Sequence, residues 1–153
     1  MDVGLFVVDG EITPVIEDGD LKEDRTLETS TLISLFTDQR VTEEELENNG
    51  LDKDEKKRGY WGDLYPDVQG DKIGSKLWLS DRAKTTPEAL ASIETRAAEA
   101  FQWMLDDGVA SSVTVEGEYD ELNRSVLDIK TSRPDGNEDR YSLIWDEQEI
   151  KRA

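Results

Sequence analysis

Residues 85–108 read TTPEALASIETRAAEAFQWMLDDG and carry the strongest helical pattern in the chain. Thr86 is a good N-cap, and Pro87 suits the first helical position because its missing N–H would be unpaired there anyway. Apolar residues then recur every three or four positions, with polar residues on the opposite side, until Gly108. We therefore predict one helix over about residues 87–106. Its buried face would carry Leu90, Ile93, Ala97, Phe101 and Leu105.

The sequence that follows this helix is typical of β-strands. SVTVEGEY (112–119) and RSVLDIKTS (124–132) alternate between apolar and polar residues, which places one side of each strand in a core. RPDGN (133–137) is a turn sequence, since Pro, Asp, Gly and Asn are the residue types that favour turns. RYSLIWD (140–146) would be the last strand. These segments predict a three-strand antiparallel meander.

The N-terminal segment also predicts β-structure. VGLFVV (3–8) and EITPVI (11–16) flank Asp9-Gly10, a two-residue signal for a tight hairpin turn. The acidic sequence EDGDLKEDR (17–25) is polar, and we predict that it is a loop.

Two helices are predicted between this loop and the long helix. In residues 26–40 the apolar side chains recur at helical spacing. In residues 41–50, Thr42 and Glu45 have the spacing of a capping box. KLWLSDR (76–82) is consistent with a short strand or a helical turn. Together these elements predict one α+β domain over residues 1–153, with the long helix packed across an antiparallel sheet.

Composition limits the function. The chain has 37 Asp and Glu against 18 Lys and Arg, a net charge of −19. Binding to nucleic-acid phosphates requires basic residues, so we predict no nucleic-acid binding, and an anionic membrane surface would repel the chain. We also expect no membrane-spanning segment and no secretion signal. The acidity itself fits either a highly soluble surface or a docking face for basic partners.

Catalytic chemistry has few candidate groups. The chain has no Cys and no His, which removes a thiolate nucleophile, the commonest general base and the commonest transition-metal ligand. A carboxylate pair among Asp63, Asp67 and Asp71 could in principle hydrolyse a glycan. DVQGD (67–71) and DGNED (135–139) resemble parts of calcium loops but lack the full pattern. We therefore predict no catalytic residue, no cofactor and no metal, and we keep a carboxylate-dependent hydrolase as the alternative.

An aromatic loop stands out in KKRGYWGDLYPDVQGDKIGSKLWLSDR (56–82). Tyr and Trp are favoured where a surface becomes an interface, and glycines on either side of Tyr60-Trp61 permit an unusual backbone. Trp61 fits either an interface or the core, whereas Trp78, Trp103 and Trp145 are predicted to be core residues. The candidate interface residues are Gly59, Tyr60, Trp61, Gly62, Asp63 and Tyr65.

The motifs TLISLFTDQR, RGYWGD, GSKLWLSDRAKTT, QWMLDDGVA, VTVEG and RPDG follow one another between about residues 26 and 136. In this order they resemble a Mu-like phage protein family of the baseplate wedge of contractile tails. The family is similar to a wider group of small wedge proteins that includes type VI secretion baseplate components. That group often carries Glu-Pro-Arg after the long helix, where this sequence has Leu105–Val109.

The resemblance implies a small α+β structural protein that sits between the sheath and the wedge core. It also implies other baseplate and wedge proteins as partners, oligomeric assembly, and a location in the virion tail after assembly in the host cytoplasm. Proteins of the wider group have been labelled lysozyme-like, in line with the hydrolase alternative. A third hypothesis is an acidic protein that mimics the charge of DNA.

Overall fold

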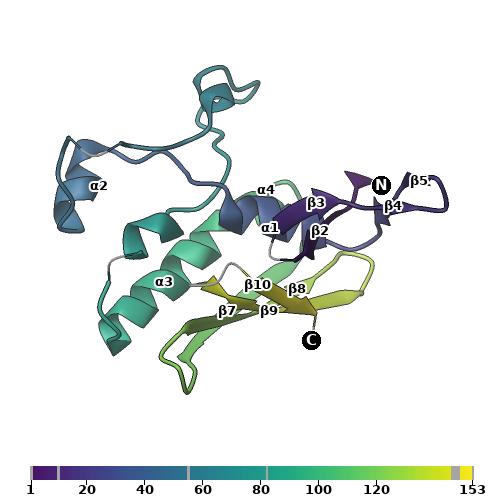
Figure 1. The fold of residues 1–153 in the computed structure, drawn as a ribbon. Helices are drawn as coiled ribbons and strands as arrows, with labels where there is room; N and C mark the ends of the chain where they lie inside the picture. The colour runs from purple at the N-terminus through teal and green to yellow at the C-terminus, as the bar shows by residue number, and fades with distance from the viewer. Residues whose placement is uncertain (1, 10, 55, 82, 146–148, 153) are drawn as a thin grey trace.

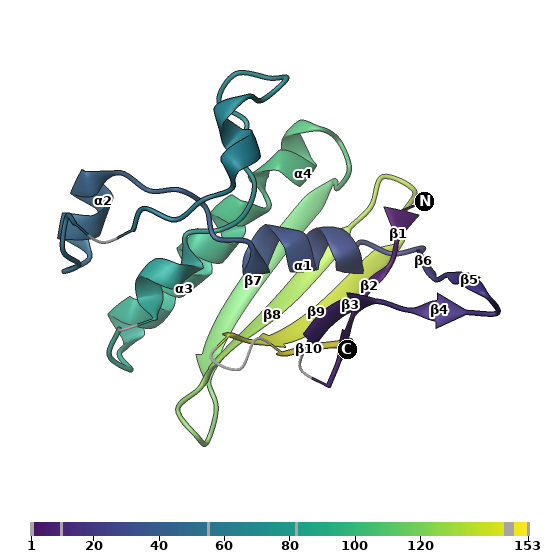
Figure 2. The same ribbon diagram turned by 45° about the horizontal axis from the view of Figure 1, so that its top comes forward.

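A four-stranded antiparallel sheet forms one layer of the protein, and helices α1, α3 and α4 cover one of its faces (Figures 1 and 2). The computed structural model describes residues 2–9, 11–54, 56–81, 83–145 and 149–152. The strand order is β10-β9-β8-β7. The strands are β7 (Ser112–Tyr119), β8 (Ser125–Ser132), β9 (Glu138–Ile144) and β10 (Glu149–Arg152). The predicted α+β class and the three-strand meander are confirmed, and β10 adds a fourth strand.

The predicted long helix is two helices, α3 (Pro87–Ala100) and α4 (Gln102–Asp106). Thr86 caps α3 as predicted, since its hydroxyl accepts a hydrogen bond from the Ala89 N–H at 3.1 Å. The prediction of one continuous helix is wrong at Phe101, where the helix tightens and the Met104 N–H donates to the Phe101 carbonyl. In such a tight turn residues three apart lie above one another. Met104 is buried, whereas Leu105, predicted to be buried, is 38% exposed.

The main core lies between the sheet and the helices. Phe101, at the junction of α3 and α4, is fully buried. It packs in one cluster with Ile93 and Ala97 of α3 and with Leu127 and Leu143 of the sheet. This cluster also includes Trp145, and Trp103 packs against it. Both tryptophans were predicted to be core residues, although Trp145 lies just after β9 and not within it.

The N-terminal residues form an arm that extends to one side of the body (Figures 1 and 2). The predicted hairpin is present as β2 (Leu5–Val8) and β3 (Glu11–Pro14), although Gly10 of its turn lies outside the described residues. The prediction that residues 17–25 are a loop is wrong. They contain parts of two further pairings: β4 (Ile16–Glu17) with β5 (Asp20–Leu21), and β1 (Asp2–Val3) with β6 (Glu23–Asp24).

A second Asp-Gly turn explains this difference. Asp18 and Gly19 have positive φ angles of 53° and 85°, as the two central residues of a type I′ hairpin require. The same dipeptide signal at residues 9–10 predicted the first hairpin. The residues around Asp18 are mostly acidic, and for that reason they were predicted to be a loop. Short edge strands tolerate charged residues, so this composition does not exclude a hairpin.

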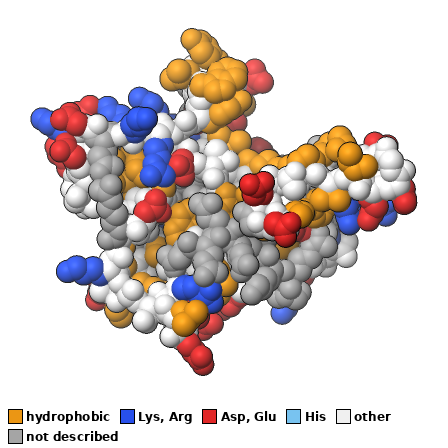
Figure 3. Space-filling view, viewed as in Figure 1, with side chains coloured by type: hydrophobic (Ala, Val, Ile, Leu, Met, Phe, Trp, Pro, Cys, Tyr) orange, Lys and Arg blue, Asp and Glu red, His pale blue; other side chains and the backbone are white. Residues whose placement is uncertain are grey.

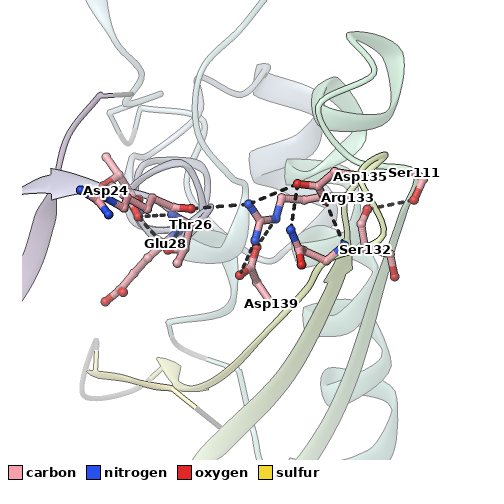
Figure 4. Close-up of polar contacts among 11 residues, drawn as sticks. Asp24, Thr26, Glu28, Ser111, Ser132, Arg133, Asp135 and Asp139 are labelled. Atoms are coloured by element: carbon pink, nitrogen blue, oxygen red, sulfur yellow. Dashed lines mark hydrogen bonds and ion pairs between the residues drawn. The ribbon is translucent and has the colours of Figure 1, made fainter.

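Helix α1 (Glu28–Phe36) joins the arm to the core, and it is shorter than the predicted 26–40. Asp24 stabilises its N-terminus: one carboxylate oxygen accepts from the Thr29 N–H at 2.7 Å, and the other accepts from the N–H and hydroxyl of Thr26. The Thr29 hydroxyl in turn accepts from the Leu5 N–H of β2. Figure 4 shows this cluster beside Arg133, whose guanidinium pairs with Asp139 at 3.0 Å.

The pKa of Asp24 predicts how this cluster responds to acid. Burial raises the pKa, but the hydrogen bonds from Thr29 and Thr26 outweigh burial and hold the pKa below its usual value. The ionised carboxylate therefore stabilises the fold above about pH 4, and this contribution is lost as the pH falls through the lowered pKa. At pH 7 we expect Asp24→Ala to cost about 1.5–3 kcal/mol in urea denaturation.

The exposed neighbour in the same strand, Glu23→Ala, is the matched control and should change stability by less than about 0.5 kcal/mol. The difference in the free energy of unfolding between Asp24→Ala and Glu23→Ala should become smaller when the urea denaturation is repeated at acid pH. A difference that is independent of pH would show that the Asp24 charge is not what stabilises α1.

A smaller core lies beside α2 (Glu43–Asn48). The predicted capping box is present, because the Thr42 hydroxyl accepts from the Glu45 N–H and the Glu45 carboxylate accepts from the Thr42 N–H. KLWLSDR contains the 3-10 turn η2 (Leu77–Ser80), one of its two predicted alternatives. Trp78 of this turn is buried, as predicted, and its indole N–H donates to the Gln39 carbonyl at 2.9 Å.

Candidate protein-interaction site

The aromatic loop, residues 59–74, is held at both ends against the segment that follows α1. At its start Gly59 has φ +100°, and a Cβ there would lie 2.4 Å from the Cβ of Arg40. At its end Gly74 has φ +97°, and a Cβ there would lie 2.2 Å from the Thr37 carbonyl oxygen. Glycine is therefore required at both ends, for its backbone angle and for the close approach.

Hydrogen bonds fix the end of the loop in more detail. Ser75 forms a parallel bridge with Asp38, in which the Ser75 N–H donates to the Thr37 carbonyl and the Gln39 N–H donates to the Ser75 carbonyl, both at 2.8 Å. The Ser75 hydroxyl also donates to the Leu35 carbonyl of α1. The loop therefore starts in close contact with Arg40 and ends at a hydrogen-bonded bridge beside α1.

Within the loop, Trp61–Leu64 form the 3-10 turn η1. Asp63 lies in this turn, and its Oδ1 accepts from the Ile73 N–H at 3.3 Å, which ties the outgoing and returning parts of the loop together. The ring of Tyr60 lies so close to Gly62 that a Cβ at Gly62 would be 2.3 Å from it. Tyr60 and Trp61 form a tilted ring pair with centroids 5.3 Å apart.

The tip of the loop is apolar and exposed. Figure 3 shows its hydrophobic atoms gathered on a projection that stands clear of the body. Trp61 is 72% exposed, which rules out the alternative that it belongs to the core of this chain. The exposed apolar side chains of the loop are Tyr60, Trp61, Leu64, Tyr65 and Val68. The three aromatic residues were predicted from the sequence as interface candidates, whereas Leu64 and Val68 were not.

A cavity of about 450 Å³ lies between the loop, α1 and the end of α4. Its apolar walls include Ile33 of α1, Tyr60 and Ile73 of the loop, and Trp103 of α4. The Trp103 indole N–H donates to the Ser34 hydroxyl at 2.9 Å, so the ring is held against α1. This cavity joins three segments that are far apart in the chain, so no local sequence pattern predicts it.

The carboxylates considered for hydrolysis are only partly brought together. Asp63 and Asp71 line the cavity, whereas Asp67 is exposed outside it. Asp63 has a structural partner in the Ile73 N–H. Among the described residues no group of three or more acidic side chains is placed to hold a metal ion, and no helix there is long and apolar enough to cross a membrane.

Comparison with known proteins identifies the family. Residues 27–138 match the model of the family described as phage protein GP46. The chain is 38% identical over 142 residues to the Mu-like prophage FluMu protein gp46 of Haemophilus influenzae, covering 93% of this chain and 94% of that protein. It is 37% identical over 124 residues to the baseplate protein gp46 of Escherichia phage Mu, covering 80% and 81%. No solved structure matches. The chain therefore belongs to the phage protein GP46 family.

Proposed function

We propose that this chain is a structural protein of a contractile phage tail baseplate that docks onto other baseplate and wedge proteins through its aromatic loop. Its relative from phage Mu is named a baseplate protein, and the similarity covers most of both chains. On this proposal the protein is oligomeric within the assembly. It is located in the virion tail after assembly in the host cytoplasm.

The observation that carries the docking proposal is the combination of rigid ends and an apolar tip. An exposed tip that carries Trp61, Leu64 and Tyr65 is costly in water, and its rigid ends reduce the entropy lost on binding. Covering one large aromatic side chain removes about 150–250 Å² from water, which is worth up to about 5 kcal/mol before ordering costs. The interface would comprise Gly59, Tyr60, Trp61, Gly62, Asp63 and Tyr65.

We propose that the protein is not an enzyme. Its relatives in the family are named as phage proteins, and Mu gp46 as a baseplate protein. The hydrolase alternative needs two free carboxylates that face a common substrate, and one of its candidates, Asp63, instead holds the loop together. The net charge of −19 argues against nucleic acid and anionic membranes as partners.

Replacement of Trp61 tests the docking proposal. The chain is co-expressed with the baseplate proteins encoded beside it, and the complexes are separated by size-exclusion chromatography. We expect wild type to co-elute with a partner and Trp61→Ala to bind at least about tenfold more weakly, since a central interface Trp contributes about 2 kcal/mol or more. The melting temperature of the isolated chain should hardly change, because Trp61 is 72% exposed.

Leu122→Ala is the matched control. Leu122 is 71% exposed, almost as much as Trp61, but it lies in the turn between β7 and β8. It should bind partners like wild type. Normal assembly of Trp61→Ala, or equal weakening by Leu122→Ala, would contradict docking through the aromatic loop.

A further inference from the structure

The cavity behind the aromatic loop has acidic groups on apolar walls. Asp63, Asp71 and Asp107 line it, and Lys72 is the single cation among the described residues that do so. The cavity therefore has a surplus of negative charge within a chain whose net charge is −19. A cationic group would be attracted to it and an anionic one repelled.

One carboxylate oxygen at this cavity lacks a partner. Asp63 uses Oδ1 to accept from the Ile73 N–H, but its Oδ2 is shielded from solvent and accepts no hydrogen bond from any described residue. Because Oδ2 is shielded from solvent, a ligand in the cavity does not reach it, and Asp63 contributes to the site through its negative charge.

The side chains that line the cavity are suited to a planar cation that is carried on an apolar methylene chain. Tyr60 and Trp103 both line the cavity, and the hydrogen bond from Trp103 to Ser34 holds one of these rings in place. A guanidinium stacks on aromatic faces and donates in a fork to carboxylates, while its methylene stem packs against apolar side chains such as Ile33 and Ile73. An ammonium lacks the planar fork.

We infer that this cavity receives an arginine side chain from a basic segment of the partner protein that covers the loop tip. The inference rests on the proposed docking function and adds the chemistry of the partner. The cavity and the exposed tip share Tyr60, so one partner surface would contact both. A second copy of this chain is a poor occupant, since two chains of charge −19 repel each other.

The probe for this site is Nα-acetyl-arginine amide, with Nα-acetyl-citrulline amide as its neutral isostere. Both are titrated into the full chain, and two-dimensional ¹H–¹⁵N NMR spectra are recorded. We expect arginine amide to produce saturable shifts of the Ile73 amide and the Trp103 indole N–H. Citrulline amide should bind at least about tenfold more weakly, because it lacks the charge.

Asp63→Asn is the variant that tests the negative charge of Asp63 at the cavity. An asparagine side-chain oxygen still accepts from the Ile73 N–H, so the loop should keep its fold, while arginine amide should bind about tenfold more weakly. Asp107→Asn, which alters an exposed residue that also lines the cavity, should weaken it less. Asp67→Asn is the control, since Asp67 lies in the same loop outside the cavity.

Equal binding of the two amides, or an equal loss in Asp63→Asn and Asp67→Asn, would overturn the inference. Its failure is distinguishable from failure of the docking proposal, because the titration uses the isolated chain. If arginine amide does not bind but Trp61→Ala still loses its partners, docking stands and the arginine pocket does not. If arginine amide binds but wild type does not co-elute with any baseplate protein, the arginine pocket stands and the docking proposal does not.

Discussion

Phe101→Ala is expected to lower the free energy of unfolding by about 3–5 kcal/mol, the usual cost of truncating a fully buried aromatic side chain. Phe101 is 0% exposed and lies in the main cluster between the helices and the sheet. It also occupies the junction of α3 and α4, so an alanine there leaves a cavity where the two helices meet. Urea denaturation followed by circular dichroism measures the loss.

Leu105→Ala is the control for this prediction. Phe101 and Leu105 are four residues apart, and the sequence pattern gave both to the buried face. Leu105 is nevertheless 38% exposed, so its truncation should cost less than about 1 kcal/mol. Equal losses in the two variants would contradict the full burial of Phe101 and the partial exposure of Leu105.

The break between α3 and α4 at Phe101 is a feature that sequence periodicity does not predict. Residues 87–100 follow the helical pattern closely, and Ile93, Ala97 and Ala100 are buried as the spacing predicts. The pattern assumes a constant helical angle, and a tight turn at Phe101 changes that angle without a Gly or Pro to mark it. Met104 belongs to the same three-and-four spacing and is buried, whereas Leu105 lies at the edge of that helix face and is partly exposed.

The N-terminal arm shows a second limit of prediction from sequence periodicity. The Asp18-Gly19 turn carries a recognisable hairpin signal, but its flanking strands have only two residues each and leave too few positions for alternation to show. The pairing of β1 with β6 joins residues about twenty positions apart. Sequence periodicity contains no information on which distant short segments will pair.

The candidate site was predicted in part for a similar reason. Trp and Tyr residues are rare, and their position between glycines lets this loop be selected from the sequence alone. The exposure of Trp61 in the structure then excludes it from the core of this chain. The cavity behind the loop depends on Ile33 and Trp103, which come from α1 and α4. Their contribution follows from the packing of α1 against α3 and from the Trp103–Ser34 hydrogen bond, which no local pattern encodes.

Gly74→Ala is expected to cost about 3 kcal/mol or more and to weaken partner binding as well. A side chain at φ +97° is strained by about 1–3 kcal/mol, and its Cβ would also lie 2.2 Å from the Thr37 carbonyl oxygen. A backbone carbonyl cannot turn aside as a flexible side chain does. The bridge between Ser75 and Asp38 must therefore shift, and with it the end of the loop that carries Ile73 into the cavity.

Gly70→Ala is the control that shows the cost of backbone strain without a close contact of the added Cβ. Gly70 lies in the same loop with φ +89°, but nothing lies within 4 Å of the position its Cβ would take. This control should therefore show the backbone strain alone, about 1–2 kcal/mol, and should bind partners nearly as wild type does. The excess loss in Gly74→Ala, measured by urea denaturation and by co-elution with baseplate proteins, reports the anchoring contact. If the two alanine variants lose equal stability and bind equally, the close approach of Gly74 to Thr37 does not hold the loop in place.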